Sequence, residues 1–212
     1  MRNTIFAILI MSFPTFLISQ VRLGISTSYA TPIVSTSEVI LGNEIGQATY
    51  GISFVDINRT TSLGIGLLAE GKRSFVNAEA HYRLNSYTFK VKNYLGTDIP
   101  VQMIEEKAST IHIPVSAGLI FNDFKIGLGP VFNFNVDQTD ALSDMGEFDD
   151  RKRTLHTGWQ WLGSYSITPN LSVFAKYEHS FSRVGDDHYY RGKRINIDSR
   201  LKYATVGFSF YL

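Results

Sequence analysis

The chain ends with Ala204-Thr205-Val206-Gly207-Phe208-Ser209-Phe210-Tyr211-Leu212, and this stretch decides the fold. Apolar residues occupy every second position, which is the period of a β-strand with one apolar face. A strand that runs to the end of a chain must still pair both of its edges, and closure of the sheet into a barrel pairs them. The terminal stretch therefore predicts an all-β, antiparallel, closed barrel.

The clearest hairpin lies in the middle of the chain. From Ile111 to Phe121 the odd positions are apolar, and after Asn122-Asp123 an apolar face continues from Phe124 to Val136. A tilted strand needs roughly 9 to 11 residues to cross a membrane, and both segments reach that length. A connection of two residues that begins with Asn is typical of a β-hairpin, so these segments are expected to pair.

The same alternation, followed along the whole chain, predicts about ten strands in a single up-and-down barrel. They cover residues 21–30, 46–56, 60–70, 74–84, 86–95, 109–121, 124–136, 153–167, 171–182 and 195–212. Tight connections at 57–59, 85, 122–123 and 168–170 alternate with long loops at 31–45, 96–108, 137–152 and 183–194, which is typical of transmembrane barrels. Residues 71–73 break this alternation, and if 60–84 is not a separate hairpin, the count falls to eight.

The first residues have the pattern of an export signal. Met1-Arg2-Asn3-Thr4 is weakly positive, and an apolar stretch follows from Ile5 to Ile18. This stretch is too short for a spanning helix, so it predicts a signal peptide over residues 1–19 and a barrel domain over 20–212. Cleavage after Ala30 is an alternative, but it would remove residues 21–30, which read as a strand.

The composition supports a barrel and excludes other classes. Lys plus Arg is 20 against 19 for Asp plus Glu, so no charge excess points to nucleic acid. The chain has no Cys, and therefore no disulfide framework. No phosphate-binding loop, zinc cluster or dinucleotide fingerprint is present, so we expect no cofactor and no metal.

Two features of this sequence resemble known outer-membrane proteins. The terminal alternation is similar to the last strand of bacterial outer-membrane barrels. Ile111-His112-Ile113-Pro114-Val115 and Gly127-Leu128-Gly129-Pro130-Val131 resemble the central hairpin of the small single-domain barrels frequent in Bacteroidetes. The resemblance implies a location in the outer membrane of a Gram-negative bacterium. It also implies contact with membrane lipids, with the barrel-assembly machinery through the C-terminal strand, and with an unidentified envelope or extracellular partner.

The alternation also assigns the two faces of the barrel wall. Aromatic residues of the apolar face are expected to form a membrane-facing girdle: Tyr50, Phe54, Trp159, Trp161, Tyr165, Phe208 and Phe210. Residues of the opposite face are expected to form a polar network in the lumen: Arg22, Glu79, His81, Arg83, Lys90, Lys125, His156, Lys176 and Glu178. A soluble ligand-carrying barrel would instead line its cavity with apolar side chains.

The lumen charges allow two functional interpretations. They can fill a small barrel as a structural network, because eight strands leave room only for side chains. Because Lys and Arg outnumber Glu among them, they can also line a narrow pore for small anions. The first hypothesis is a non-enzymatic barrel with an envelope-structural or surface-interaction role carried by its loops, and the porin-like passive pore is the alternative.

A third hypothesis is a hydrolase at the outer rim that acts on lipid A or peptides. His179 and Ser180 are faintly similar to the lipid A deacylases, but that family has Ser two residues after His, where this chain has Phe181. Adjacent strand residues also point to opposite faces. Residues 186–188 resemble the acidic and histidine pairs of omptin proteases in residue type alone. We therefore expect no catalytic residue.

Overall fold

The computed structural model describes residues 20–33, 38–42, 47–95, 100–139, 141–143, 148–150, 154–183, 188–195 and 200–212. The predicted signal peptide, residues 1–19, lies outside this part of the chain, as do parts of the predicted long loops. None of the described residues forms a helix long and apolar enough to cross a bilayer. The strands are β1 (Gln20–Ile33), β2 (Glu38–Gly42), β3 (Ala48–Ile57), β4 (Thr60–Glu70), β5 (Ser74–Asn93), β6 (Val101–Phe121), β7 (Phe124–Gln138), β8 (Phe148–Asp150), β9 (Leu155–Ser166), β10 (Leu171–Arg183), β11 (His188–Tyr190), β12 (Lys193–Arg194) and β13 (Arg200–Tyr211).

Eight of these strands close a ring. Their order is β1-β4-β5-β6-β7-β9-β10-β13, every neighbour is antiparallel, and β13 returns to β1 through pairs that run from Gly24↔Tyr211 to Ile33↔Lys202. Strands β2 and β3 extend the same sheet to ten strands but lie outside the ring. The closed antiparallel barrel expected from the sequence is confirmed.

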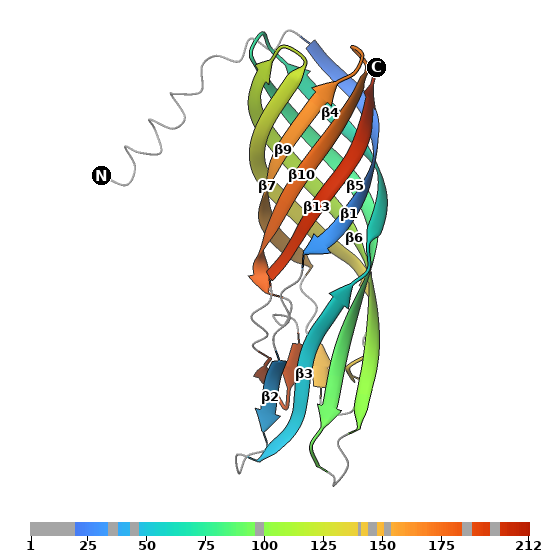
Figure 1. Cartoon of the computed structure of the whole chain (residues 1–212), viewed down its shortest axis with the longest axis vertical. Helices are drawn as coiled ribbons and strands as arrows, with labels where there is room; N and C mark the ends of the chain where they lie inside the picture. The colour runs from blue at the N-terminus through green and yellow to red at the C-terminus, as the bar shows by residue number, and fades with distance from the viewer. Residues whose placement is uncertain are drawn as a thin grey trace, which may run out of the picture.

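The ring has a turn end and a loop end. Three tight connections, after β4, β6 and β9, lie at the turn end together with the C-terminus (Figure 1). Asn122 takes a left-handed conformation, φ 55°, in the two-residue connection after β6, which explains the preference for Asn there. Residues 71–73 therefore belong to the turn end, whereas residues 57–59 join β3 to β4 at the loop end. The predicted alternation of tight turns and long loops fails at these two connections, because two strands outside the ring intervene between β1 and β4.

Strands β5 and β6 extend well beyond the ring. They contain 20 and 21 residues, about twice what a membrane crossing requires. The far half of β5 pairs with β3, from Tyr50↔Asn93 to Ile57↔Tyr87, and β3 pairs with β2. Figure 1 shows these strands beside the far ends of β5 and β6, past the loop end. We call β2, β3 and the far halves of β5 and β6 the projecting sheet.

The predicted turn at Asn85 does not exist. Residues 74–93 form one continuous strand, so the predicted strands 74–84 and 86–95 are two halves of β5. Asn85 is buried and continues the inward alternation after Arg83, and its amide donates a hydrogen bond to Thr110 at 3.3 Å. Continuous pairing with β6, in which Asn85 is opposite Ala108, overrides the turn preference of a single Asn.

The outer wall of the ring is apolar. Large apolar side chains point outward on several ring strands, for example Leu23 on β1, Ile65 on β4, Leu128 on β7 and Phe208 on β13, each more than half exposed. The alternating residues point into the lumen and are mostly polar. This apolar-out, polar-in arrangement is that of a barrel surrounded by hydrocarbon.

The projecting sheet packs on an apolar core, to which Ala30 of β1 and Tyr203 of β13 contribute from the ring. Phe54 packs edge-on against Phe89, with ring centroids 5.6 Å apart. Tyr50 packs in the same way against Phe148 of β8 and Tyr190 of β11, in a small second sheet that covers this face. Tyr50 and Phe54 are buried, so their assignment to the membrane-facing girdle was wrong. Their strand, β3, pairs with the projecting half of β5. The apolar face of β3 therefore packs against a protein core and not against lipid.

Phe89→Ala is expected to loosen the projecting sheet and to leave the ring intact. Phe89 is 1 % exposed, and truncation of a buried Phe typically costs about 3 to 5 kcal/mol. Amide hydrogen exchange should become faster in β3 and the far half of β5, while the amides of β13 keep their protection. Phe208→Ala, which removes an outward ring from the barrel wall, is the matched control and should leave the projecting sheet unchanged. Equal loss of protection in β13 and β3 would mean that the projecting sheet and the ring unfold as one unit.

Candidate functional site in the lumen

The turn end of the lumen is closed by apolar side chains. Leu68, Phe75, Leu162, Phe174 and Tyr211 form a buried cluster there. Closer to the turn end, at the mouth of the lumen, is a cluster of charged side chains. Glu70 accepts a hydrogen bond from Lys125 at 2.8 Å there and also pairs with Arg22. From the turn end inward, the lumen therefore begins with an ion-pair cluster, and an apolar layer follows it.

The next level is centred on Glu79, which is 3 % exposed. Lys176 and His81 both donate to Glu79 Oε2 at 2.6 Å, and Asn77 donates to Oε1 at 2.8 Å. The ammonium of Lys176 also lies 4.4 Å from the centre of the Phe174 ring, in a cation–π contact. Each oxygen of this buried carboxylate thus has a partner, as a buried charge requires.

Two glycines on β4 make room for these side chains. Gly64 is opposite His81 and Gly66 is opposite Glu79 in the β4–β5 register. A Cβ at Gly64 would lie 2.6 Å from His81 Nδ1, and one at Gly66 would lie 3.0 Å from Glu79 Cγ. The short distances explain why the inward positions of β4 carry no side chain at this level.

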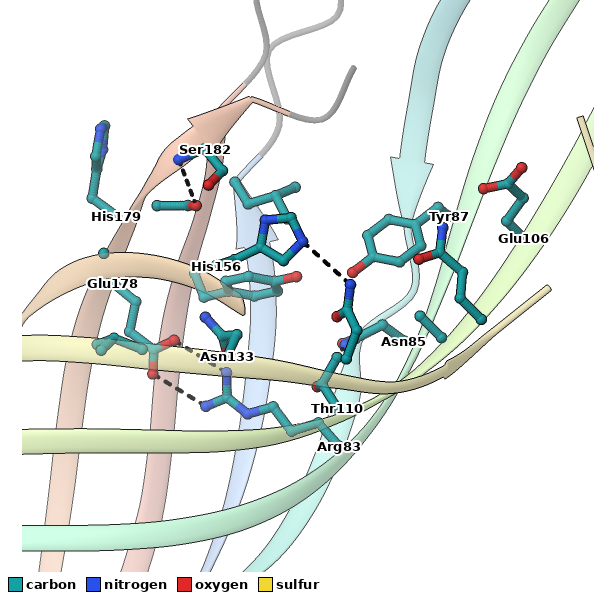
Figure 2. A pocket seen from close by; sticks show the side chains of 18 of the residues that line it. Arg83, Asn85, Tyr87, Glu106, Thr110, Asn133, His156, Glu178, His179 and Ser182 are labelled. Carbon is teal, nitrogen blue, oxygen red and sulfur yellow. Dashed lines mark hydrogen bonds and ion pairs between the residues drawn. The ribbon is translucent and has the colours of Figure 1, made fainter. Parts of the chain in front are cut away.

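The third level is centred on Glu178, which is also buried. Arg83 donates to both carboxylate oxygens at 3.1 Å, a bidentate geometry, and His112 Nε2 lies 3.2 Å from Oε1. Figure 2 shows the guanidinium of Arg83 directed at the carboxylate of Glu178. The other ring nitrogen of His112 donates to Asn133 at 2.7 Å, which fixes the imidazole between two strands.

Both of the main ion pairs cross the full width of the ring. Glu79 and Arg83 are on β5, and their partners Lys176 and Glu178 are on β10. In the order of the eight strands, β10 is directly opposite β5, with three strands between them on either side. The two pairs are therefore transverse bridges, and the side chains of the lumen meet in its centre.

A cavity of about 90 Å³ lies on the loop-end side of the bridges. Arg83 and Glu178 line the cavity toward the bridges, and Glu106 lines it toward the projecting sheet. Tyr87 and His156 lie between them (Figure 2). At this size the cavity can hold several water molecules. Arg83 Nε and Asn85 Oδ1 are buried beside it and have no protein partner, so water in the cavity would satisfy them.

One arrangement in the lumen has the residue types of a serine hydrolase. Ser62 Oγ lies 3.3 Å from His81 Nδ1, and the other nitrogen of His81 donates to Glu79. However, Ser62 and His81 line none of the cavities described here, and Lys176 neutralises the carboxylate. A nucleophile without space for a substrate beside it cannot carry out acyl transfer. This arrangement is a packed polar network.

The rim residues considered as a hydrolase are not arranged for catalysis. His179 stacks on Trp159 at 5.8 Å on the outer wall, whereas Ser180 lies on the opposite face of β10 and accepts from the Ser182 amide at 3.2 Å. His188 lies 3.8 Å from Glu106. Asp186 and Asp187 are outside the described residues. Among the described residues, no group of three or more His, Cys, Asp or Glu could hold a metal ion.

Most of the predicted lumen residues do lie in the lumen, with one exception. Arg22, Glu79, His81, Arg83, Lys125, His156, Lys176 and Glu178 all point inward. Lys90 does not, because it lies on the projecting half of β5, opposite Ser53 of β3 and Met103 of β6, and that assignment was wrong. In the predicted girdle, Trp161, Tyr165, Phe208 and Phe210 are exposed on the outer wall, and Trp159 packs beside Trp161.

Two carboxylates of the lumen and its cavity, Glu70 and Glu106, were not predicted from the sequence. Glu70 has the same parity as Gly64, Gly66 and Leu68 on β4, so the inward alternation could have located it. Glu106 fell in a predicted loop, because β6 begins earlier than its apolar pattern does. With these two included and Lys90 removed, the described lumen and cavity hold four Lys or Arg and four Glu, and the predicted excess of positive charge is not present: Arg22, Arg83, Lys125 and Lys176 against Glu70, Glu79, Glu106 and Glu178.

Comparison with solved structures supports the same architecture. The chain is similar to the outer membrane protein OprG from Pseudomonas aeruginosa, with 12% identity, a TM-score of 0.51, and coverage of 91% of this chain and 95% of OprG. It is similar to the outer membrane protein AlkL, with 12% identity, a TM-score of 0.50 and 95% coverage of each chain. The fold is that of an outer-membrane β-barrel. No protein-family model matches the chain, and no curated protein matches it.

An exposed ion pair on the projecting sheet contrasts with the bridges. Lys92 donates to both oxygens of Glu38, at 2.8 and 3.0 Å. This hydrogen bond holds the pKa of Glu38 below its usual value and raises the pKa of Lys92. Both groups remain in water, so their interaction is weak compared with that of a buried pair.

Arg83→Met and Glu178→Met are each expected to destabilise the barrel strongly, and the double variant much less than their sum. Each single change leaves one buried charge without its partner, which typically costs about 3 to 5 kcal/mol, whereas the double change replaces both charges with apolar groups. Urea unfolding in lipid vesicles measures the three free energies. The matched cycle at Lys92 and Glu38 should show a much smaller coupling than the cycle at Arg83 and Glu178, and additive effects at Arg83 and Glu178 would contradict the bridge.

Proposed function

We propose that the chain is a non-enzymatic outer-membrane barrel that does not conduct, and that its projecting sheet is the functional surface. The observation that carries the proposal is the pair of transverse bridges, Glu79–Lys176 and Arg83–Glu178, which occupy the lumen from one wall to the opposite wall. The apolar cluster around Phe75 and Tyr211 closes the lumen a second time, on the turn-end side of the bridges. These layers support a structural role for the ring.

The charge balance also argues against an anion-selective pore. Selection of anions requires cationic side chains whose charge is available to a passing ion. Lys176, Arg83 and Lys125 each lie within 3.1 Å of a carboxylate oxygen, so their charge is already neutralised. Passage would require these pairs to separate in a medium of low dielectric constant, which is costly.

The projecting sheet is the feature best suited to contact with a partner. It extends past the ring on β5 and β6, packs on an apolar core, and stays anchored to the barrel through continuous backbone. Function in barrels usually resides on such elements, which a rigid scaffold holds away from the bilayer. We place the loop end outside the cell, because the turn end has the short connections that are typical of the periplasmic side.

Planar-bilayer recording is expected to show no ohmic steps for the folded protein. A variant that truncates to alanine both bridges (Glu79, Arg83, Lys176 and Glu178) and two residues of the apolar cluster (Phe75 and Tyr211) should conduct, because both closures of the lumen are then removed. Lys90→Ala, which removes a charge outside the lumen, is the control and should stay silent. Heat-modifiable migration on gels verifies that each variant folds. Reproducible steps from the unaltered protein would show that the barrel is a pore and overturn the proposal.

Cysteine labelling tests the orientation, because the chain has no cysteine of its own. Met103→Cys on the projecting sheet, where Met103 is 59 % exposed, should react with a membrane-impermeant maleimide on intact cells. Lys72→Cys, in the turn after β4, should react only after the outer membrane is permeabilised. The reverse pattern would mean that the projecting sheet faces the periplasm.

A further inference from the structure

A row of aromatic and basic side chains crosses the outer wall of the ring near its loop end. Cross-strand pairing places Trp159 of β9 beside His179 of β10, and His179 beside Lys202 of β13. The next residues along β10 and β13, Glu178 and Tyr203, point into the lumen, so His179 and Lys202 point outward. Three neighbouring strands thus contribute to one continuous surface.

The aromatic part of this surface is closely packed. The rings of Trp159 and His179 are stacked, with an interplanar angle of 24°. Trp159 also contacts Trp161 and Tyr177 edge-on, at 6.0 and 5.9 Å between centroids. Aromatic rings of this kind lie at the level where hydrocarbon meets the headgroups. We call the following six residues the rim patch: Trp159, Trp161, Tyr177, His179, Arg200 and Lys202.

The basic residues lie at the upper edge of the apolar wall. On β13 the outward positions from Phe210 to Ala204 are apolar, and Lys202 is the next outward residue, ten positions before Leu212. At about 3.3 Å per residue and a tilt of about 40°, ten residues rise roughly 25 Å, which is the height of the apolar band in such barrels. Lys202 is therefore level with the lipid phosphates on the loop-end side of the bilayer, and Arg200 lies just beyond it.

The charges of the rim patch have no carboxylate partner among the described residues. No ion pair or hydrogen bond joins the side chain of Lys202 or Arg200 to an acidic group in this part of the chain, whereas Arg83 and Lys176 in the lumen are both paired. Two cations that have no acidic partner in the described part of the chain lie here beside a packed aromatic cluster, at headgroup level, and this combination is complementary to a ligand with an anionic head and apolar tails.

We propose that the rim patch binds the phosphate of an anionic membrane lipid. Lys202 and Arg200 contact the phosphate oxygens, and the lipid chains lie on the rings of Trp159 and Tyr177. The aromatic cluster is packed before the lipid arrives, so little side-chain freedom is lost on binding. Each cation near an anionic lipid surface favours binding roughly five-fold. The proposal goes beyond the proposed function and rests only on its placement of the ring in a membrane.

The two tryptophans of the chain report directly on this site, because both belong to the rim patch. The protein is refolded into vesicles that contain phosphatidylglycerol and phosphatidylcholine in equal amounts, with bromine on the chains of one lipid or the other. Bromine quenches tryptophan fluorescence on contact. We expect brominated phosphatidylglycerol to quench more, with a preference of about five-fold or greater for the anionic lipid at the site.

The double variant Arg200→Gln and Lys202→Gln should lose this preference, so that both brominated lipids quench equally. Lys72→Gln, which removes one positive charge at the turn end of the same barrel, is the matched control and should keep it. All three substitutions are of surface residues, and heat-modifiable migration verifies their folding. Inorganic phosphate, compared with chloride at equal ionic strength, should leave the lipid preference unchanged.

Three outcomes would overturn the proposal. Equal quenching of the unaltered protein by both lipids would mean that the patch does not select charge. A preference that survives in the double variant would place the selective site elsewhere. Loss of the preference on addition of inorganic phosphate would identify a site for the free anion and not for a lipid. If neither brominated lipid quenches, the proposed membrane placement itself fails, and that result is distinct from the other three.

Discussion

The pairing of β13 with β1 is the contact on which the rest of the structure depends. It joins the last strand to the first through ten consecutive residue pairs and leaves the ring without an edge. In hydrocarbon an unpaired amide or carbonyl costs several kcal/mol, because no water is present to replace the missing partner. An apolar outer wall is therefore compatible only with a closed ring, and closure in turn forces the alternating side chains into a narrow lumen.

Closure buries charged side chains in the centre of the barrel, and ion pairs in the lumen compensate these charges. Eight strands bring inward side chains into contact across the centre, and a charged group in that position is stable only when it is paired and hydrogen-bonded. Strands β5 and β10 meet this condition together, since each contributes one carboxylate and one cation to the two bridges. The bridges add little net stability compared with apolar packing, but they require one register between opposite strands. A shift of β5 or β10 by one residue would turn the two charges of that strand toward the outer wall.

The length of β5 and β6 connects the ring to the projecting sheet. Along β5, the inward residues change from Phe75 through Glu79 and Arg83 to Phe89, so that one strand passes from an apolar plug through a polar lumen to a second apolar core. No linker separates these regions. The projecting sheet is thus held at a defined angle to the ring, and a partner bound to it would meet a rigid surface.

The outer wall shows a different use of charge from the lumen. Inside, Lys176 and Arg83 are buried and are matched by carboxylates, because no lipid headgroup can supply a counter-charge in the lumen. At the rim, Lys202 and Arg200 lie where the surroundings can supply the counter-charge. The same residue types therefore serve packing in the lumen and recognition at the rim, and the face of the wall on which they lie distinguishes the two roles.

Much of the fold could be predicted from the sequence, because a period of two is a local property. The terminal alternation from Ala204 to Leu212 required a closed barrel, and the parity of Glu79, Arg83, Lys176 and Glu178 placed them on one face. Parity alone could not assign Lys90, Tyr50 or Phe54, since the same alternation continues from the ring into the projecting sheet. Which face meets lipid, lumen or protein core depends on which strands pair, and pairing joins residues far apart in sequence. The transverse bridges and the composition of the lumen were therefore decided by the tertiary structure.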